Sequence, residues 1–350
     1  MADFLQLHFL TAYGPANLNR DDTGRPKSAV VGGVPRLRVS SQSLKRAWRT
    51  SEVFATRLEN HLGSRTQRLG QDIHDHLRAG GMADDKALAT ARAIAGIFGK
   101  IRKESDKQPT FIEQLAFVSP EERAAAFALA DKALAGEEIA PDGDDLLRKT
   151  DTAADIAMFG RMLADDPKFN REAAVQVAHA ITTHRAVAED DYYTAVDDLK
   201  SRDEPEDAGA GFVGVQEFGS GVFYLYVCVD RDLLLRNLEG ATAVRDAALA
   251  ALVEAAATVG PRGKQASFAS HACAIYGMAE TGPAHPRSLA AAFLDPVTGN
   301  GDYGGRSIAA LEGFRDKLDQ AYGPRAAARR GMNVGLGEGT LQDLIDFAVS

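Results

Sequence analysis

The stretch FVGVQEFGSGVFYLYVCVD, residues 212–230, carries the strongest strand pattern in the chain. Apolar residues alternate with others as far as Phe218, and a second alternating run covers residues 222–229. Gly219-Ser220-Gly221 lies between the two runs, and short glycine-containing segments in that position are typical of hairpin turns. The pattern therefore predicts a β-hairpin.

Before this stretch, the sequence predicts two strands and a helix. Residues 4–10 alternate as a strand does, and after an irregular segment, residues 11–34, a short strand over residues 36–40 has Arg36 and Arg38 on one face. Ser40 or Ser41 can cap a helix that runs to about residue 62.

The rest of the chain is mainly helical in its periodicity. Residues 57–188 predict an insertion of short helices, and strand-like residues 192–199 precede a polar, glycine-rich loop over residues 200–211. A helix over 242–258, a strand over 273–278 and helical stretches at 288–294, 308–322 and 341–349 complete the chain. This order predicts an α+β fold with a split βαβ antiparallel sheet and long insertions, and not a Rossmann sheet.

The composition indicates a protein of the cytoplasm. No apolar run among the 350 residues approaches the roughly 18 needed to span a bilayer, and the polar N-terminus is unlike a signal peptide. The two cysteines, Cys228 and Cys273, have no zinc spacing, and we interpret both as small core residues. We expect no membrane association and no disulfide framework.

The net charge of −9 on 40 basic and 49 acidic residues argues against a nucleic-acid partner, but the distribution of charge reverses that argument. Residues 20–49 contain eight basic and two acidic residues, so this segment is +6 and the remainder is −15. In the predicted helix, Gln42, Lys45, Arg46 and Arg49 share one face, and Leu44, Ala47 and Trp48 lie on the other.

Such a basic face can be simply a solvated helix surface, or it can bind phosphate. Three cations in the first two turns of a helix oppose its macrodipole, so stability does not explain them. Five further cations precede the helix and favour a phosphate backbone that is bound without base specificity; they are Arg20, Arg25, Lys27, Arg36 and Arg38.

Motifs for catalysis or metal binding are weaker. His74-Asp75-His76 predicts side chains on different helix faces, and residues 179–184 lack the glutamate of a zinc-protease motif. The glycine pairs lack the lysine of a P-loop. The sequence therefore indicates binding rather than catalysis, with no metal and no cofactor.

The segment LNRDDTGRPKSAVVGGVPRLRVSSQSLKRAWRTS, residues 18–51, resembles the N-terminal signature of the CasC family, the backbone subunit of the type I-E CRISPR-associated Cascade complex. Further matching segments are DIAMFGRM (155–162), AHAITTH (178–184), YYTAVDDL (192–199), GAGFVGVQEFGSGVFYLY (209–226) and GKQASFA (263–269). The similarity covers residues 1 to about 280, and the last 70 residues are less distinctive.

The resemblance implies a hand-shaped protein with an RRM-like (ferredoxin-like) palm over residues 1–60 and 217–350, helical fingers over 61–185 and a thumb over 186–216. In this family several copies stack along the spacer part of the crRNA, beside other Cascade subunits, and present the guide for pairing with target DNA. The subunit has no catalytic activity, and a separate helicase-nuclease is recruited to the complex.

The resemblance also implies individual RNA-binding residues. It assigns the crRNA backbone to Lys27, Ser40, Gln42, Lys45, Arg46 and Arg49, a base contact to Met162, and the thumb wedge to Thr194 and Val196. Tyr192-Tyr193 replaces the Trp-Phe pair of the family, and stacking by Tyr193 should survive the exchange. The basic segments before the helix and after residue 260 add Arg20, Arg38 and Lys264 to the predicted RNA-binding set.

Two other functions remain open from the residues. One is an RNA-cleaving enzyme that uses His8 or His179 beside the basic residues. The other is a general single-strand binder, which would form indefinite filaments on any strand.

Overall fold

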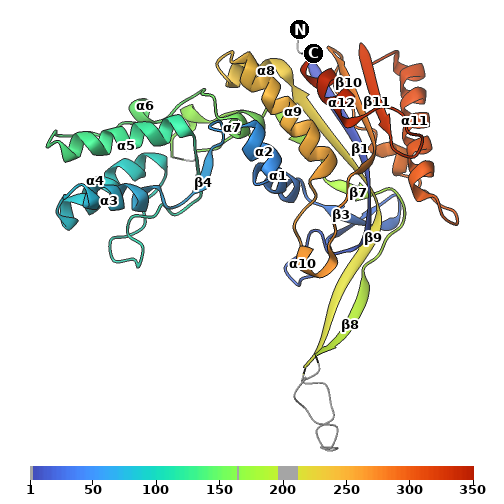
Figure 1. Cartoon of the computed structure of the whole chain (residues 1–350), viewed down its shortest axis with the longest axis horizontal. Helices are drawn as coiled ribbons and strands as arrows, with labels where there is room; N and C mark the ends of the chain where they lie inside the picture. Colours follow the sequence, from blue (N-terminus) through green and yellow to red (C-terminus); the bar gives the residue numbers. More distant parts are fainter. Residues whose placement is uncertain (1–2, 164, 196–211) are drawn as a thin grey trace, which may run out of the picture.

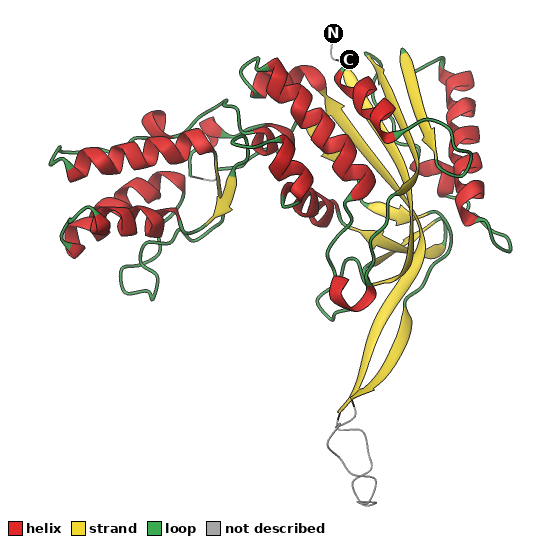
Figure 2. Ribbon diagram, in the orientation of Figure 1, coloured by secondary structure: helices red, strands yellow, loops and turns green. Residues whose placement is uncertain are grey.

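The computed structural model describes residues 3–163, 165–195 and 212–350. It has three parts: a central sheet with helices on both faces, a helical lobe to one side, and a long two-stranded hairpin that projects from the sheet (Figures 1 and 2). The N- and C-termini lie close together at the end of the sheet opposite the hairpin (Figure 1).

The central sheet is antiparallel and runs in the order β11-β10-β1-β9-β7-β3-β2, with β6 and β8 also paired to β9. Its strands are β1 (Phe4–Ala16), β2 (Ser28–Val31), β3 (Val34–Val39), β6 (Val175–Val177), β7 (Ala180–Thr182), β8 (Glu189–Ala195), β9 (Phe212–Asp230), β10 (Ala274–Gly282) and β11 (Ala328–Asn333). This confirms an α+β fold with an antiparallel sheet. The expected strand at residues 4–10 extends to Ala16, β2 lies in the segment expected to be irregular, and β11 was not predicted.

The predicted hairpin at residues 212–230 is wrong, because β9 is one continuous strand of 19 residues. Its first half pairs with β8 and its second half with β1. The glycines at its centre serve close packing rather than a turn: a Cβ on Gly219 would lie 2.4 Å from Cδ1 of Leu37, and one on Gly221 would lie 2.9 Å from Nε2 of His184. The hairpin instead joins β8 to β9.

Each face of the sheet has its own apolar core. On one face, Leu5, Leu7 and Phe9 of β1 pack with α9, whose many alanines allow its backbone to approach the sheet closely. On the other face, Leu10 and Tyr224 pack with Phe293 and Leu311. The helices around the sheet are α1 (Ser41–Arg49), α2 (Glu52–Arg57), α7 (Ala154–Phe159), α8 (Arg231–Asn237), α9 (Thr242–Thr258), α10 (Gln265–Phe268), η4 (Ala290–Phe293), α11 (Tyr303–Tyr322) and α12 (Leu341–Val349).

The helical lobe, residues 64–169 without α7, has a separate apolar core that includes Ile73, Ile94 and Phe98. Its elements are β4 (Ser64–Thr66), α3 (Leu69–Ala79), α4 (Asp84–Ala95), η1 (Gly96–Phe98), β5 (Ala116–Val118), α5 (Pro120–Leu134), α6 (Gly143–Leu146) and η2 (Pro167–Phe169). The predicted fingers range, 61–185, therefore also contains α7, which packs against α9, and strands β6 and β7 of the central sheet.

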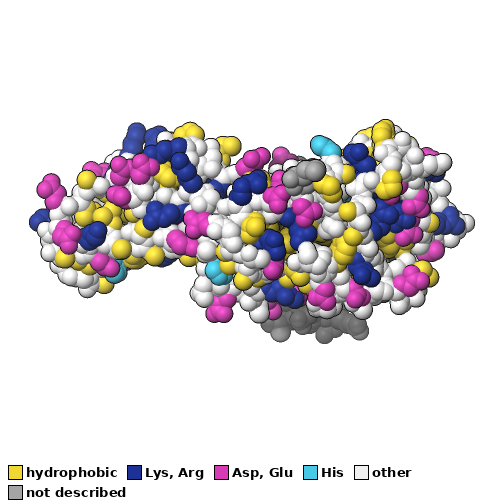
Figure 3. Space-filling view, turned by 90° about the horizontal axis from the view of Figure 1, so that it is seen from above, with side chains coloured by type: hydrophobic (Ala, Val, Ile, Leu, Met, Phe, Trp, Pro, Cys, Tyr) yellow, Lys and Arg dark blue, Asp and Glu magenta, His cyan; other side chains and the backbone are white. Residues whose placement is uncertain are grey.

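The two cysteines differ in exposure. Cys228 is buried as expected, but Cys273 is exposed, because it lies just before β10 begins. On the face shown in Figure 3, acidic and basic side chains are interspersed over both the lobe and the central part. No helix in the described part of the chain is both long and apolar enough to span a membrane.

Candidate nucleic-acid interface

Helix α1 presents the basic face that the sequence predicts, but the helix is shorter than expected. Ser40 is its N-cap and accepts a hydrogen bond from the Ser43 N–H, while Leu44, Ala47 and Trp48 are buried. The helix ends at Arg49 because Ser51 caps a second helix, accepting from the Phe54 N–H. Arg46 and Arg49 thus lie in the last turn, where a positive charge interacts favourably with the helix macrodipole. The prediction that these two cations oppose the macrodipole is therefore wrong.

The basic face of α1 forms one wall of a groove of about 420 Å³ between the central part and the helical lobe. Gln42, Lys45, Arg46 and Arg49 line it together, as predicted from their spacing. The lobe supplies most of the opposite wall, with Arg65, Leu115, Phe117, Gly160, Arg161 and Met162, and Phe159 at the end of α7 completes it. Burial and the nearby Arg65 both lower the pKa of Lys45, so cations crowd together in this groove.

Cations continue from the groove onto the adjoining edge of the sheet. The Arg38 N–H of β3 donates to the Lys27 carbonyl, and the Lys27 N–H donates to the Asn19 carbonyl, which fixes the preceding loop against β3. We name Lys27, Arg38, Lys45, Arg46 and Arg65 the cationic surface. Among the residues that the structure describes, no carboxylate forms an ion pair with any of these five side chains.

Three cations of the basic segment have carbonyl or carboxylate partners for their side chains and are not part of this surface. Arg36 is fully buried, and its guanidinium donates to the carbonyls of Thr182 and Phe293. It is buried because the residues around Phe293 cover the face of β3 at Arg36, whereas they leave Arg38 on the same face uncovered. The expectation that Arg36 lies exposed beside Arg38 is therefore wrong. Arg25 pairs with Glu217 at 2.6 Å, and Arg49 pairs with Asp155 at 2.9 Å, so both have acidic partners that the sequence did not reveal.

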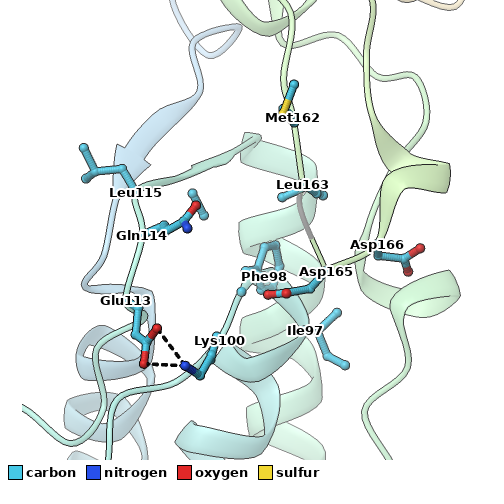
Figure 4. A pocket seen from close by; sticks show the side chains of 12 residues that line it. Ile97, Phe98, Lys100, Glu113, Gln114, Leu115, Met162, Leu163, Asp165 and Asp166 are labelled. Atoms are coloured by element: carbon cyan, nitrogen blue, oxygen red, sulfur yellow. Dashed lines mark hydrogen bonds and ion pairs between the residues drawn. The ribbon is translucent and has the colours of Figure 1, made fainter.

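Met162 projects into the groove from a loop that buried ion pairs hold in place. Its side chain is 84% exposed, whereas the neighbouring Arg161 is buried and pairs with Glu122 at 2.6 Å. Arg161 and Arg171 also exchange two backbone hydrogen bonds. Figure 4 shows Met162 above a smaller pocket of about 110 Å³, which Leu115, Glu113 and Asp165 help to line. An exposed apolar side chain on a fixed loop can make a base contact at little entropic cost.

The β8–β9 hairpin carries part of the predicted thumb. Tyr193 lies directly over Gly214, where an added Cβ would be 2.4 Å from Cζ of the tyrosine ring, and Thr194 is exposed. Lys264 lies at the base of the hairpin, with Nζ 3.4 Å from Oε1 of Gln216. Val196 falls outside the described residues.

The remaining predicted residues differ in exposure. Arg20 is exposed and bridges to Pro26 through the backbone, whereas Ser40 is 6% exposed and engaged as the α1 cap. Sequence reasoning missed Arg65, because it lies in the lobe and reaches α1 only through tertiary packing. It considered His179 for catalysis alone, although this side chain lies against Arg38.

The other histidines considered from the sequence, His8, His74 and His76, lie elsewhere and have partners. His8 is fully buried, with Nδ1 2.9 Å from the Tyr224 hydroxyl, and burial lowers its pKa. His74 and His76 diverge, as expected, toward Asp84 and Asp131. Among the described residues, no group of three or more His, Cys, Asp or Glu side chains is arranged to hold a metal ion.

Comparison with known proteins agrees with this fold. A solved structure described as "CRISPR RNA-guided surveillance complex, pre-nicking" contains a chain that matches at a TM-score of 0.83 and 30% identity, with 99% of both chains covered. A second, described as "CRISPR RNA-guided surveillance complex", matches at a TM-score of 0.74 and 27% identity, with the same coverage. No curated protein sequence matches significantly.

The fold is therefore that of chains found in CRISPR RNA-guided surveillance complexes, and the class expected from the sequence, a Cascade subunit, is confirmed. The model of one family, described as CT1975-like protein, matches residues 5–345, and the chain belongs to this family.

Proposed function

We propose that this chain is a non-catalytic backbone subunit of a type I-E Cascade complex, which binds the spacer part of the crRNA and presents it to target DNA. The observation that carries the proposal is the cationic surface, where five Lys and Arg side chains from α1, β3, β4 and the loop before β2 have no acidic partner among the described residues. On a protein of net charge −9, such a concentration favours an anionic ligand over a merely solvated surface.

The chemistry of this surface suits a guide of variable sequence. Lys and Arg bind phosphate irrespective of the base, and Met162 offers an apolar contact that any base can use. In the proposed arrangement the sheet is an RRM-like palm, the helical lobe forms the fingers and the β8–β9 hairpin forms the thumb. Copies stack along the crRNA beside other Cascade subunits, and a separate helicase-nuclease cuts the target DNA in the cytoplasm.

The absence of RNA cleavage by this chain is part of the proposal. The buried position of His8 supports it, because a fully buried ring that bonds to Tyr224 cannot reach a bound RNA. Incubation of the purified protein with its repeat RNA should leave the RNA intact. Specific cleavage of the repeat RNA that is abolished by His179→Ala would instead show that this chain is an RNA-cleaving enzyme.

Charge reversal tests the RNA site. Lys45→Glu should weaken binding of single-stranded RNA to a similar degree for different sequences and lower the log–log salt slope by about 0.7 for a lost phosphate contact. Lys317→Glu, at an exposed position on α11, is the matched control and should change neither value. An unchanged affinity and slope for Lys45→Glu would exclude this surface as the RNA site.

Assembly distinguishes a Cascade subunit from a general single-strand binder. With the other subunits and a guide of defined length, the number of copies should be fixed, and longer unrelated RNA should not increase it. Filaments that grow indefinitely on any strand would favour the general binder.

A further inference from the structure

His179 lies at the edge of the cationic surface, in the two-residue connection between β6 and β7. Its ring is exposed, and Nδ1 is 2.7 Å from Nη1 of Arg38. The neighbouring Ala180 pairs with Val39 of β3, and the Ala178 N–H donates to the Tyr226 carbonyl of β9. Backbone pairing on both sides therefore fixes the position of this imidazole beside β3.

The contact with Arg38 determines which ring nitrogen carries the proton. A guanidinium can only donate hydrogen bonds, so Nδ1 of His179 must accept, and the hydrogen of a neutral ring is then on Nε2. The groups around the ring agree with a neutral state. Partial burial and the positive charges of Arg38, Lys27 and Lys45 all lower the pKa of His179. The described structure gives Nε2–H no partner within the protein.

We propose that His179 is an additional RNA ligand, whose Nε2–H donates to a backbone oxygen of the strand that Lys27, Arg38 and Lys45 hold. This inference rests on the proposed function. A neutral donor adds a directional hydrogen bond among crowded cations without adding to their mutual repulsion. It differs from the nuclease hypothesis because the imidazole binds the strand and transfers no proton.

Binding of a fluorescein-labelled single-stranded RNA of mixed sequence, measured by anisotropy at several salt concentrations, tests the proposal. His179→Ala should weaken binding about fivefold, as the loss of one neutral hydrogen bond does, and should leave the salt slope unchanged. His179→Gln should restore most of the affinity, since a glutamine amide can accept from Arg38 and also donate. His285→Ala, at another exposed histidine, should have no effect.

A double-mutant cycle separates a direct contact from the positioning of Arg38. In an Arg38→Ala background, His179→Ala should still weaken binding, whereas no further loss would mean that His179 only orients Arg38 and would overturn the proposal. A salt slope that falls in His179→Ala, or an effect that disappears between pH 7 and 8.5, would show a charged contact and also contradict it.

RNA binding by the wild-type protein distinguishes a failure of the proposed function from a failure of the role of His179. If the wild-type protein fails to bind RNA, the proposed function fails. If it binds normally and His179→Ala binds equally well, only the role of His179 is overturned. Thermal unfolding of each variant should match that of the wild-type protein, because the ring is exposed and bonds to a single side chain.

Discussion

Nε of Arg49 lies 2.9 Å from Oδ2 of Asp155, and the guanidinium also stacks on the Phe117 ring at 4.1 Å from its centroid. The other carboxylate oxygen of Asp155 accepts the Gly63 N–H at 2.8 Å. The pair thus joins α1 to α7 and to the start of the helical lobe. Burial raises the pKa of Asp155, and the positive charge of Arg49 opposes that rise. Arg49 therefore shapes the groove as well as lining it.

Loss of Arg49 should destabilise the fold. In Arg49→Met the almost fully buried Asp155 carboxylate loses its counter-ion, and we expect the free energy of unfolding to fall by about 3 kcal/mol in urea denaturation. The double variant Arg49→Met/Asp155→Asn should recover part of this loss. Arg46→Ala, on the same helix but exposed, should change stability by less than about 0.5 kcal/mol. Equal stability of the Arg46 and Arg49 variants would contradict the structural role of the pair.

Met162 should affect RNA binding without affecting stability. Because its side chain is 84% exposed, Met162→Ala should leave the unfolding temperature unchanged. If the thioether packs on a base, its loss should cost about 0.3–1.5 kcal/mol of binding free energy, at an unchanged salt slope. Anisotropy titrations with RNAs of different sequence measure both quantities. If Met162→Ala bound RNA with the affinity of the wild-type protein, the predicted contact between Met162 and a base would be contradicted.

Gly219 should be essential for the packing of β3 on β9. A Cβ at this position would lie 2.4 Å from Cδ1 of Leu37, so Gly219→Ala should destabilise the protein by about 1–3 kcal/mol through overpacking. Gly313, within α11, has nothing within 4 Å of an added Cβ, and Gly313→Ala should stabilise that helix by about 0.5–1 kcal/mol. Denaturant titrations of both variants give the comparison, and a neutral Gly219→Ala would contradict the close approach.

Acid should destabilise the protein through His8. Burial lowers the pKa of His8 below its usual 6.5, so the folded state binds fewer protons at this site than the unfolded state does. Above pH 6.5 the ring is neutral in both states and His8 does not make the free energy of unfolding depend on pH. As the pH falls below 6.5, the free energy of unfolding declines by at most about 1.4 kcal/mol per pH unit because of this residue. Glu280, which lies beside it, has a lowered pKa and responds only at more acidic pH.

Urea denaturation at pH 7.5, 6.5 and 5.5 tests this expectation. His8→Gln should be less stable at pH 7.5 because the hydrogen bond to Tyr224 changes, but its stability should fall less steeply with pH than that of the wild-type protein. His285→Gln, at an exposed position, should retain the wild-type slope. Parallel pH curves for the wild-type protein and His8→Gln would contradict a role for the buried ring.

Individual residues show which features of the structure can be predicted from the sequence. Spacing alone placed Gln42, Lys45, Arg46 and Arg49 on one face, because helical geometry is local. The sequence pattern predicted a turn at Gly219, and this was wrong. A glycine in a turn and a glycine that makes room for a leucine of another strand look alike in sequence. The sequence pattern also failed at Arg36 because strand alternation gives the face of a side chain but not what covers that face.

The sequence by itself determined the class of fold, the family and the presence of a basic segment on an acidic chain, since periodicity, motifs and charge are properties of neighbouring residues. Only the tertiary structure decided which cations remain without a partner. It buried Arg36, paired Arg25 with Glu217 and Arg49 with Asp155, and brought Arg65 and His179 to the surface formed by Lys27, Arg38 and Lys45. Coulomb interactions and hydrogen bonds depend on distance in space, and the chain fixes those distances only when it folds.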